Sequence, residues 1–374
     1  MSIPFIDLKA QQSRIREKID TGIANVLDSN AYIMGPPVAA LETRLAEWAG
    51  AKHAVSCSSG TDALLLALHG LGLQPGQGVI VPSFTFAASC EVMPTMGAIP
   101  VFAEVDPVTF NIDPAQLDAA LTAGRDAGIE VVGIIGVGLF GQPADFDAII
   151  SFARNEGLWV IDDAAQSFGA RLGGRPVGNL ADVTCTSFFP AKPLGCYGDG
   201  GAVFTDNDEI AEIMRSCRIH GMGKDKYENI RIGMTGRLDT IQAVVLDAKL
   251  DIFASELVAR QSAADLYEEL LGNHVETPRV MAGATSSWAQ YTIKLPASTK
   301  RARFCEKMQE AGVPTAIYYP IPMHQQPPYI GYPVANGALA TTATLCDCVV
   351  ALPMHPYLNA ETQTKIVEAV RASL

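Results

Sequence analysis

Residues 129–163 read IEVVGIIGVGLFGQPADFDAIISFARNEGLWVIDD, and this stretch decides the fold. The apolar run at 129–138 predicts a buried strand, residues 145–156 predict an amphipathic helix, and residues 158–162 predict a second strand. A strand, a helix and a strand in this order are typical of a parallel βαβ unit. The same alternation extends from about residue 37 to about residue 245. We therefore predict an α/β fold with helices on both faces of a mostly parallel sheet.

A change of pattern predicts a second, smaller domain. Residues 238–271 form one long helical stretch, and only two strand-like segments follow it, at 288–294 and 313–319. A proline-rich loop at 319–328 comes next, and loops of this kind are rigid. We expect a large domain at residues 1–245 and a small C-terminal α/β domain at 246–374. The N-terminal segment could pack on the small domain.

Composition excludes several classes of partner. The 374 residues carry a formal net charge of −13, which repels nucleic acid and anionic membrane surfaces. No run approaches the ~20 apolar residues of a membrane-spanning helix, and the first residues lack the pattern of an export signal. The one close cysteine pair, Cys346 and Cys348, has no histidines or second pair beside it, so we predict no metal site. We expect a cytoplasmic protein.

Lys192 is the first candidate catalytic residue. It is the only cationic residue of TSFFPAKPLGCYGDGGAVF at 186–204, where aromatic and small residues surround it. A lysine in a loop is in most cases a solvated surface charge. Desolvation by apolar neighbours, however, lowers a lysine pKa and makes the amine available for a Schiff base.

Asp162 and Asp163 end a predicted buried strand, and Gln166 follows them. Adjacent strand residues point to opposite faces, so the two carboxylates are poorly placed to grip one metal ion. One of them should face the crevice at the carboxyl end of the sheet, where ligands of α/β proteins bind. A carboxylate there could keep a pyridine nitrogen protonated, although Asp163 could equally cap a following helix.

Residues 58–62, SSGTD, come directly before an apolar helix. Free N–H groups and hydroxyls at a helix N-terminus suit a phosphate, but the same residue types are ordinary helix caps. Phe86, in the segment after the strand predicted at 77–82, could stack on a flat ring or belong to the core.

Taken together, these motifs resemble the sugar-nucleotide aminotransferases of the DegT/StrS type, which belong to the fold type I pyridoxal-phosphate enzymes. The resemblance runs through nearly the whole chain. Its most specific segments are DAAQSFGA at 163–170 and the lysine block at 186–202. The others are FIDLKAQQ at 5–12, SGTDAL at 59–64, PSFTF at 82–86, RIHG at 218–221, GRLDTIQA at 236–243 and YYPIPMHQQP at 318–327.

The resemblance implies a role for each matching residue. Lys192 would carry pyridoxal 5'-phosphate as a Schiff base, and family members that dehydrate sugars have histidine at this position. Asp163 would pair with the pyridinium nitrogen, and Gln166 would lie near the 3-hydroxyl. The remaining cofactor contacts would come from Gly60, Thr61 and Ser187 at the phosphate and from Phe86 on the ring face.

Within the family, the chain looks most similar to enzymes that aminate C3 of UDP-2-acetamido-2-deoxy-3-oxo-glucuronate, with glutamate as donor, for surface polysaccharides such as the lipopolysaccharide O-antigen. Arg237 would hold the uronate carboxylate, which a guanidinium fork suits. Such enzymes are homodimers with shared active sites, so Thr235, Tyr318 and Tyr319 are candidates for contacts between subunits. Thr235 replaces the usual asparagine at a partner's cofactor phosphate, and Tyr318 replaces a histidine of the usual His-Tyr pair.

Two alternatives stay open. One is an aminotransferase for another 3- or 4-keto sugar on a dTDP, GDP or UDP carrier; a deoxysugar has no carboxylate for Arg237. The other is a regulatory protein that binds the cofactor or a sugar nucleotide without turnover. The presence of Lys192, Asp163 and Gln166 together weighs against a pure binding protein, which has no need of an electron sink.

Overall fold

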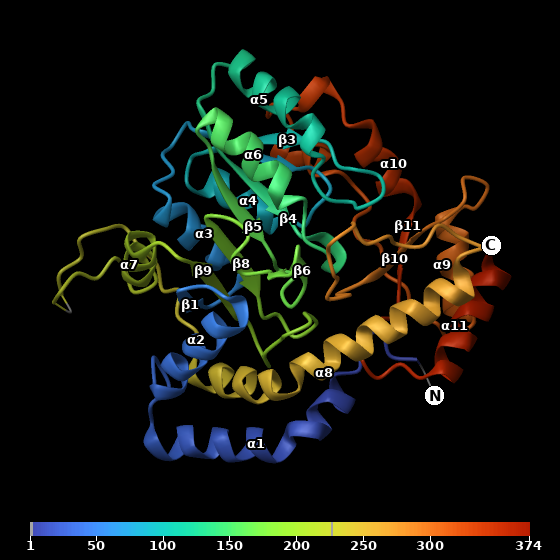
Figure 1. Cartoon of the computed structure of the whole chain (residues 1–374), viewed down its shortest axis with the longest axis horizontal. Helices are drawn as coiled ribbons and strands as arrows, with labels where there is room; N and C mark the ends of the chain where they lie inside the picture. Colours follow the sequence, from blue (N-terminus) through green and yellow to red (C-terminus); the bar gives the residue numbers. More distant parts are fainter. Residues whose placement is uncertain (1–2, 226) are drawn as a thin grey trace.

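The computed structural model describes residues 3–225 and 227–374. Its main sheet has seven strands in the order β1-β9-β8-β5-β4-β2-β3 (Figure 1). β9 runs antiparallel to both neighbours, and the other adjacent pairs are parallel. The predicted α/β class is therefore confirmed. The strands are β1 His53–Cys57, β2 Gly78–Pro82, β3 Ile99–Ala103, β4 Val131–Val137, β5 Trp159–Asp163, β8 Val183–Ser187 and β9 Gly201–Thr205.

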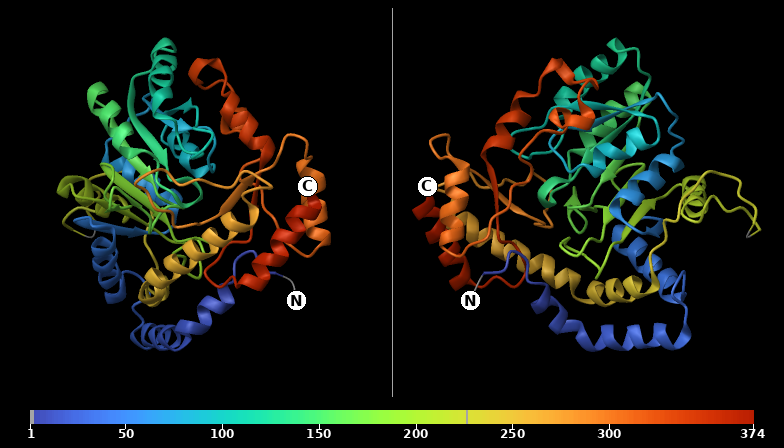
Figure 2. Two further views of the ribbon diagram at one scale, coloured as in Figure 1. Left: turned by 45° about the vertical axis from the view of Figure 1, so that its right-hand side comes forward. Right: turned by 180° about the vertical axis from the view of Figure 1, so that it is seen from behind.

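Helices cover both faces of this sheet (Figures 1 and 2). Alternate residues of β1 and β9 belong to two separate cores, as the period of a strand requires. Val55 and Val203 pack in the cluster that contains α3, whereas Ala54 and Phe204 pack with α2 and α8. The helices along the sheet are α2 Pro36–Ala49, α3 Gly60–Gly70, α4 Ala88–Thr95, α5 Leu117–Asp126, α6 Phe146–Glu156 and α7 Asp208–Cys217.

The stretch that predicted the fold forms β4, α6 and β5 in that order. The carboxylate of Asp145 accepts a hydrogen bond from the Ala148 N–H at the start of α6, and Gly157 ends the helix in the left-handed conformation. β4 and β5 then pair in parallel. Gly133 is required between them, because a Cβ there would lie 2.2 Å from the Trp159 ring. The helix and the two strands predicted from the sequence are all present.

One long helix links the main sheet to the C-terminal part. α8, Thr240–Leu271, begins beside α2 and ends against α11, and α1, Leu8–Ser29, lies along it (Figures 1 and 2). The predicted domain boundary between residues 245 and 246 falls inside α8 and stays a prediction.

The C-terminal part has its own apolar core. The end of α8 packs there with the two-stranded antiparallel sheet β10-β11 and with helices α9 and α11. Ile3 of the N-terminal segment contacts this core, and the Phe5 carbonyl accepts a hydrogen bond from the Met354 N–H. The elements are β10 Tyr291–Lys294, α9 Arg301–Glu310, α10 Ala340–Cys348, β11 Val349–Leu352 and α11 Ala360–Ser373.

The strand predicted at 313–319 is wrong. Only Ala316 makes a β-bridge, to Ala351 of β11. Pro314 lies inside the segment and Pro320 follows it directly, and proline has no N–H to donate to a sheet. The residues between them instead lead into the proline-rich loop.

Smaller elements complete the chain. β6 Arg171–Leu172 and β7 Arg175–Pro176 form a short hairpin. Five 3₁₀ turns lie at Pro114–Gln116, Leu139–Gly141, Met323–Gln325, Pro327–Tyr329 and Ala335–Gly337 within the described ranges. None of the described helices is long and apolar enough to cross a membrane.

Candidate active site

A cavity of about 460 Å³ opens at the carboxyl ends of the central strands. Its walls come from the start of α3, the loop after β2, the ends of β5 and β8, and the loop that carries Lys192. This edge of an α/β sheet is where ligands bind. Nine of the eleven residues predicted for the site line it: Gly60, Thr61, Phe86, Asp163, Gln166, Ser187, Lys192, Tyr318 and Tyr319.

Lys192 lies in the loop between β8 and β9. The loop is closed by backbone hydrogen bonds from the Phe188 N–H to the Gly200 carbonyl and from the Cys196 N–H to the Phe188 carbonyl, both of 2.7 Å. Burial lowers the pKa of the Lys192 amine, and the negative charge of Asp163 opposes this shift in part. A larger share of neutral amine, the form that attacks a carbonyl carbon, follows from the burial.

The two adjacent aspartates have different environments. Asp163 lines the cavity and accepts hydrogen bonds from Ser89 Oγ at 2.6 Å and from the Ala165 N–H at 3.2 Å. Asp162 is fully buried, and neither of its oxygens has a hydrogen-bond partner among the described residues. Burial raises the pKa of both carboxyls, and for Asp162 well above the usual value. Turns and no α-helix follow Asp163, so the alternative of a helix cap is excluded.

Gln166 is held in one orientation. Its Oε1 accepts a hydrogen bond of 2.8 Å from the Phe140 N–H, and its Nε2 lies 3.2 Å from Tyr319 Oη. Phe140 itself lies in the left-handed region, with a φ of 60°. Since a backbone N–H only donates, the oxygen of Gln166 must face Phe140 and the NH₂ group must face Tyr319 and the cavity.

An anion cradle lies at the start of α3. Ser59 Oγ accepts the Asp62 N–H at 3.0 Å, and the Ser59 carbonyl accepts the Ala63 N–H. Because the first N–H groups of a helix have no intrahelical partner, those of Gly60 and Thr61 remain for an anion. Ser187 Oγ accepts the Phe189 N–H at 3.2 Å, so its own proton is available too.

Aromatic rings form another wall of the cavity. Phe86 is 56% exposed, an unusual degree for a phenylalanine beside a cavity. Its ring centroid lies 6.2 Å from that of Tyr319, and Phe84 lies 6.3 Å from Tyr319 on another side. A flat ring bound against Phe86 would cover apolar surface that now faces solvent.

Thr235 and Arg237 do not line this cavity. Both lie in the loop after α7, whose described parts project from the body of the protein (Figures 1 and 2). Thr235 Oγ1 lies 2.8 Å from His220 Nε2, and Arg237 Nε has no hydrogen-bond partner within the described ranges. By contrast, Tyr318 and Tyr319, which we expected to reach a partner subunit, line the cavity of their own chain.

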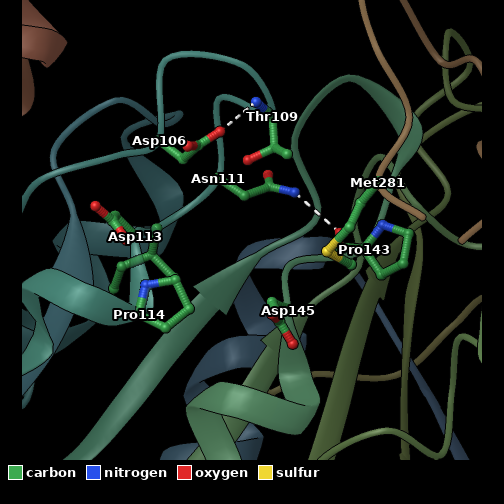
Figure 3. A pocket seen from close by; sticks show the side chains of 9 residues that line it. Asp106, Thr109, Asn111, Asp113, Pro114, Pro143, Asp145 and Met281 are labelled. Atoms are coloured by element: carbon green, nitrogen blue, oxygen red, sulfur yellow. Dashed lines mark hydrogen bonds between the residues drawn. The ribbon is translucent and has the colours of Figure 1, made fainter. Parts of the chain in front are cut away.

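A second hollow, of about 200 Å³, is lined by a separate set of residues (Figure 3). Three carboxylates line it, and each already accepts local backbone N–H groups: Asp106 from Val108 and Thr109, Asp113 from Ala115, and Asp145 from Ala148. No group of three or more His, Cys, Asp or Glu among the described residues is placed to hold a metal ion. The carboxylates of this hollow therefore serve turns and helix starts.

Comparison with known families decides the identity of the fold and its chemistry. The model of the DegT/DnrJ/EryC1/StrS aminotransferase family matches residues 13–371. The chain belongs to this family. The DegT/StrS resemblance drawn from the motifs is thereby confirmed, as is the prediction of a pyridoxal-phosphate-dependent sugar aminotransferase.

Similar proteins cover almost the full length of the chain. The UDP-2-acetamido-2-deoxy-3-oxo-D-glucuronate aminotransferase of Pseudomonas aeruginosa is 46% identical over 96% of both sequences. The crystal structure of a DegT DnrJ EryC1 StrS aminotransferase from Brucella abortus has a TM-score of 0.96, with 45% identity and 99% coverage of both chains. The structure of NtdA from Bacillus subtilis with bound cofactor PMP has a TM-score of 0.88 and 28% identity, covering 100% of this chain and 85% of that one.

The cavity of this DegT/StrS-family protein fits pyridoxal phosphate. A phosphate matches the cradle at Gly60 and Thr61, where the close approach of Ser187 leaves no room for a Cβ on residue 60. A carboxylate, Asp163, and an amine, Lys192, line the same space. These are the donors and charges that a phosphorylated pyridine aldehyde requires, and no metal is needed among them.

Sequence reasoning missed several residues of the cavity. Thr85, Ser89 and Gln290 line it, as do Phe5 and Ile6 from the N-terminal segment. The DegT/StrS motifs at 5–12 and 82–86 include three of these five positions, so the motifs pointed to the right segments without assigning a role. Ser89 and Gln290 lie outside every motif, and a single serine or glutamine carries no signal of its own.

Proposed function

We propose that this protein transfers an amino group from glutamate to C3 of UDP-2-acetamido-2-deoxy-3-oxo-glucuronate. The observation that carries the proposal is one cavity that joins Lys192, Asp163 and the cradle at α3. The choice of sugar is supported by the 46% identity to the P. aeruginosa enzyme named for this substrate. The product fits the expected use in surface polysaccharides.

Lys192 is the proposed catalytic residue. When bound, pyridoxal phosphate supplies an electron sink for electrons released at the substrate carbon. Lys192 Nζ would hold the cofactor and, when free, would act as the base that takes a proton from the substrate carbon. The lowered pKa of this amine suits a base that must give up and regain a proton in each half-reaction.

Four contacts are proposed to hold the cofactor in place. Asp163 keeps the ring nitrogen protonated, and the NH₂ group of Gln166 donates to the 3-hydroxyl oxygen. The orientation of that amide, fixed by Phe140, supports this assignment. Phe86 stacks on the ring, and the N–H groups at the start of α3, with Ser187, bind the phosphate.

The active sites are proposed to be shared in a homodimer. Within the described part of the chain, Lys192 is the one cationic residue that lines the cavity, so another cation must meet the carboxylates of glutamate and of the uronate. Thr235 and Arg237, on the projecting loop, are the proposed contributions of the partner. Ile230 and Ile232 on this loop are 52% and 85% exposed, and burial against a second copy would remove this apolar surface from water.

The experiment is an absorption titration of the purified protein loaded with pyridoxal phosphate. Glutamate should remove the visible band of the bound cofactor, and UDP-2-acetamido-2-deoxy-3-oxo-glucuronate should restore it. The same sugar without the carboxylate, UDP-2-acetamido-2-deoxy-3-oxo-glucose, is the matched control and should restore it more slowly. If glutamate removes the band and the uronate sugar does not restore it, the proposed sugar substrate is contradicted and glutamate remains the donor.

One alternative is an aminotransferase for a keto deoxysugar on another carrier. Such a sugar has no carboxylate, so replacing Arg237 by alanine would affect its turnover little. For the uronate sugar the same substitution should raise KM about tenfold to a hundredfold, because a charged hydrogen-bond pair is lost.

A further inference from the structure

A chain of two hydroxyl groups reaches Asp163 from the side of α4. Ser89 Oγ lies 2.6 Å from Asp163 Oδ2, and Thr85 Oγ1 lies 2.9 Å from Ser89 Oγ. Thr85 and Ser89 are each 1% exposed, and Asp163 is 4% exposed. Three polar groups thus form one buried line, from the loop after β2, through the first turn of α4, to the end of β5.

The direction of both hydrogen bonds follows from the charge of Asp163. An ionised carboxylate only accepts hydrogen bonds, so the Ser89 proton must point to Asp163. A hydroxyl has a single proton, so Thr85 must donate to Ser89. Both O–H dipoles then point toward the carboxylate, and dipoles aligned in this way strengthen each other.

These donors distinguish Asp163 from its neighbour Asp162. Burial raises the pKa of Asp163, and the bonds from Ser89 and from the Ala165 N–H lower it again. Neither oxygen of Asp162 has a partner in hydrogen-bonding geometry among the described residues. The nearby Thr184 hydroxyl opposes the shift only in part, and the pKa of Asp162 stays well above the usual value because of burial and the charge of Asp163. Two adjacent buried carboxyls repel each other when both are ionised. The negative charge therefore resides on Asp163, the one that lines the cavity.

The chain also joins two walls of the cavity. Thr85 directly precedes Phe86, whose ring is the exposed aromatic of the site, and Ser89 follows three residues later. Asp163 ends β5, a different element of the sheet. A displacement of the Phe86 loop would therefore stretch the bond between Ser89 and Asp163.

We propose that Thr85 and Ser89 are positioning residues that hold Asp163 as an oriented carboxylate for the ring nitrogen of pyridoxal phosphate and fix the Phe86 loop to it. The proposal rests on the cofactor site described under the proposed function. Neither hydroxyl is assigned a contact with the cofactor; both act through Asp163.

The test compares cofactor binding by four apoproteins: wild type, Ser89→Ala, Ser89→Thr and Thr85→Val. Each is titrated with pyridoxal phosphate and with its 1-deaza analogue, in which a C–H group replaces the ring nitrogen. Ser89→Ala should weaken binding of pyridoxal phosphate about tenfold, the loss expected for one hydrogen bond to a charged group. Ser89→Thr keeps the hydroxyl and should recover most of the affinity, and Thr85→Val should show a smaller loss in the same direction.

The deaza analogue separates this role from general support of the fold. It has no ring nitrogen for Asp163 to meet, so Ser89→Ala and wild type should bind it equally. An equal loss of affinity for both cofactors would overturn the proposal and leave the cofactor site itself intact. If the wild type binds neither cofactor, the proposed function fails and this inference with it.

A second readout is the chemical shift of the ring nitrogen in bound ¹⁵N-labelled pyridoxal phosphate. In wild type the nitrogen should stay protonated across the stable pH range. In Ser89→Ala the proton should leave the ring at lower pH, because Asp163 loses a donor that stabilises its negative charge and therefore stabilises the protonated ring less. An unchanged titration in both Ser89→Ala and Thr85→Val would overturn the proposal, and circular dichroism establishes that each variant is folded.

Discussion

At the scale of single residues, Gly60 leaves no room for a side chain. A Cβ at this position would lie 2.7 Å from Ser187 Cβ, inside the proposed phosphate cradle. Gly60→Ala should therefore weaken binding of pyridoxal phosphate about tenfold, equivalent to 1.4 kcal/mol. Equilibrium titration of the apoprotein measures this. Pyridoxal without its phosphate is the control ligand, and equal losses for both ligands would contradict a role at the phosphate.

The Lys192 amine should react with the cofactor in a pH-dependent way. Its pKa lies below the usual 10.5 because of burial, so the rate of covalent attachment should rise with pH and level off below that value. Asp163 raises this pKa, so Asp163→Asn should move the midpoint to still lower pH. Stopped-flow absorption of apoprotein mixed with pyridoxal phosphate gives both midpoints. A higher midpoint in Asp163→Asn would contradict the electrostatic coupling.

The sequence predicted those site residues that lie at or just after the ends of strands of the sheet. Lys192, Asp163 and Gln166 follow strands of one sheet, and parallel strands bring their carboxyl ends together, so their meeting in one cavity was predictable. The hydroxyl chain of Thr85 and Ser89 could not be predicted from the sequence. Two small polar residues have no distinctive pattern, and only the fold places them beside a carboxylate.

At the scale of elements, α8 contains a lysine whose charge is costly to bury. Lys249 is 1% exposed, and its Nζ lies 4.6 Å from the centroid of the Tyr197 ring. Burial lowers the pKa of Lys249 from 10.5 to about 8. The folded protein thus binds this proton less tightly than the unfolded chain does. The penalty is full below about pH 8 and disappears as the pH rises toward 10.5.

Lys249→Met should therefore stabilise the protein near neutral pH, by on the order of 2 kcal/mol, because it removes the buried charge and retains the apolar stem. The gain should shrink toward pH 10.5, where the lysine is neutral in both states. Urea unfolding at the two pH values measures it. Lys365→Met, at an exposed ion pair, is the control and should change little. A gain that is the same at both pH values would point to packing instead of charge.

The elements themselves were predictable where the pattern was local. Apolar runs predicted β4 and β5, and apolar residues at a period of 3.6 between them predicted α6. The segment at 313–319 has β-branched residues, yet Pro314 within it and Pro320 after it limit it to one β-bridge. A run of strand-forming residues is therefore insufficient where the neighbouring backbone has no N–H groups to pair.

At the scale of the whole molecule, the account requires two chains for one complete site. Lys192→Ala should be inactive alone, because it lacks the proposed cofactor link. Arg237→Ala should be nearly inactive at a substrate concentration well below its raised KM, because it lacks the proposed cation for the substrate. When the two are mixed, denatured and refolded together, roughly a quarter of wild-type activity should return, because half of the dimers are mixed and each has one intact site.

A matched mixture controls for this result. Lys192 and Asp163 line the same cavity of one chain, so a hybrid of Lys192→Ala with Asp163→Asn has one lesion in each cavity and no intact site. Its activity should stay at the level of the Asp163→Asn homodimers in the mixture. A further mixture combines the wild-type chain with a double variant that carries both Lys192→Ala and Arg237→Ala. Its hybrids have no complete site if the residues act across the interface, and one complete site if Arg237 acts within its own chain.

The most direct test of the central claim is to locate the covalent bond between cofactor and protein. The protein is incubated with pyridoxal phosphate, reduced with borohydride, digested and analysed by mass spectrometry. The account predicts a single pyridoxyl phosphate group on Lys192 and none in Lys192→Ala. Attachment to another lysine, or equal labelling of Lys192→Ala, would contradict the assignment of this cavity as the active site.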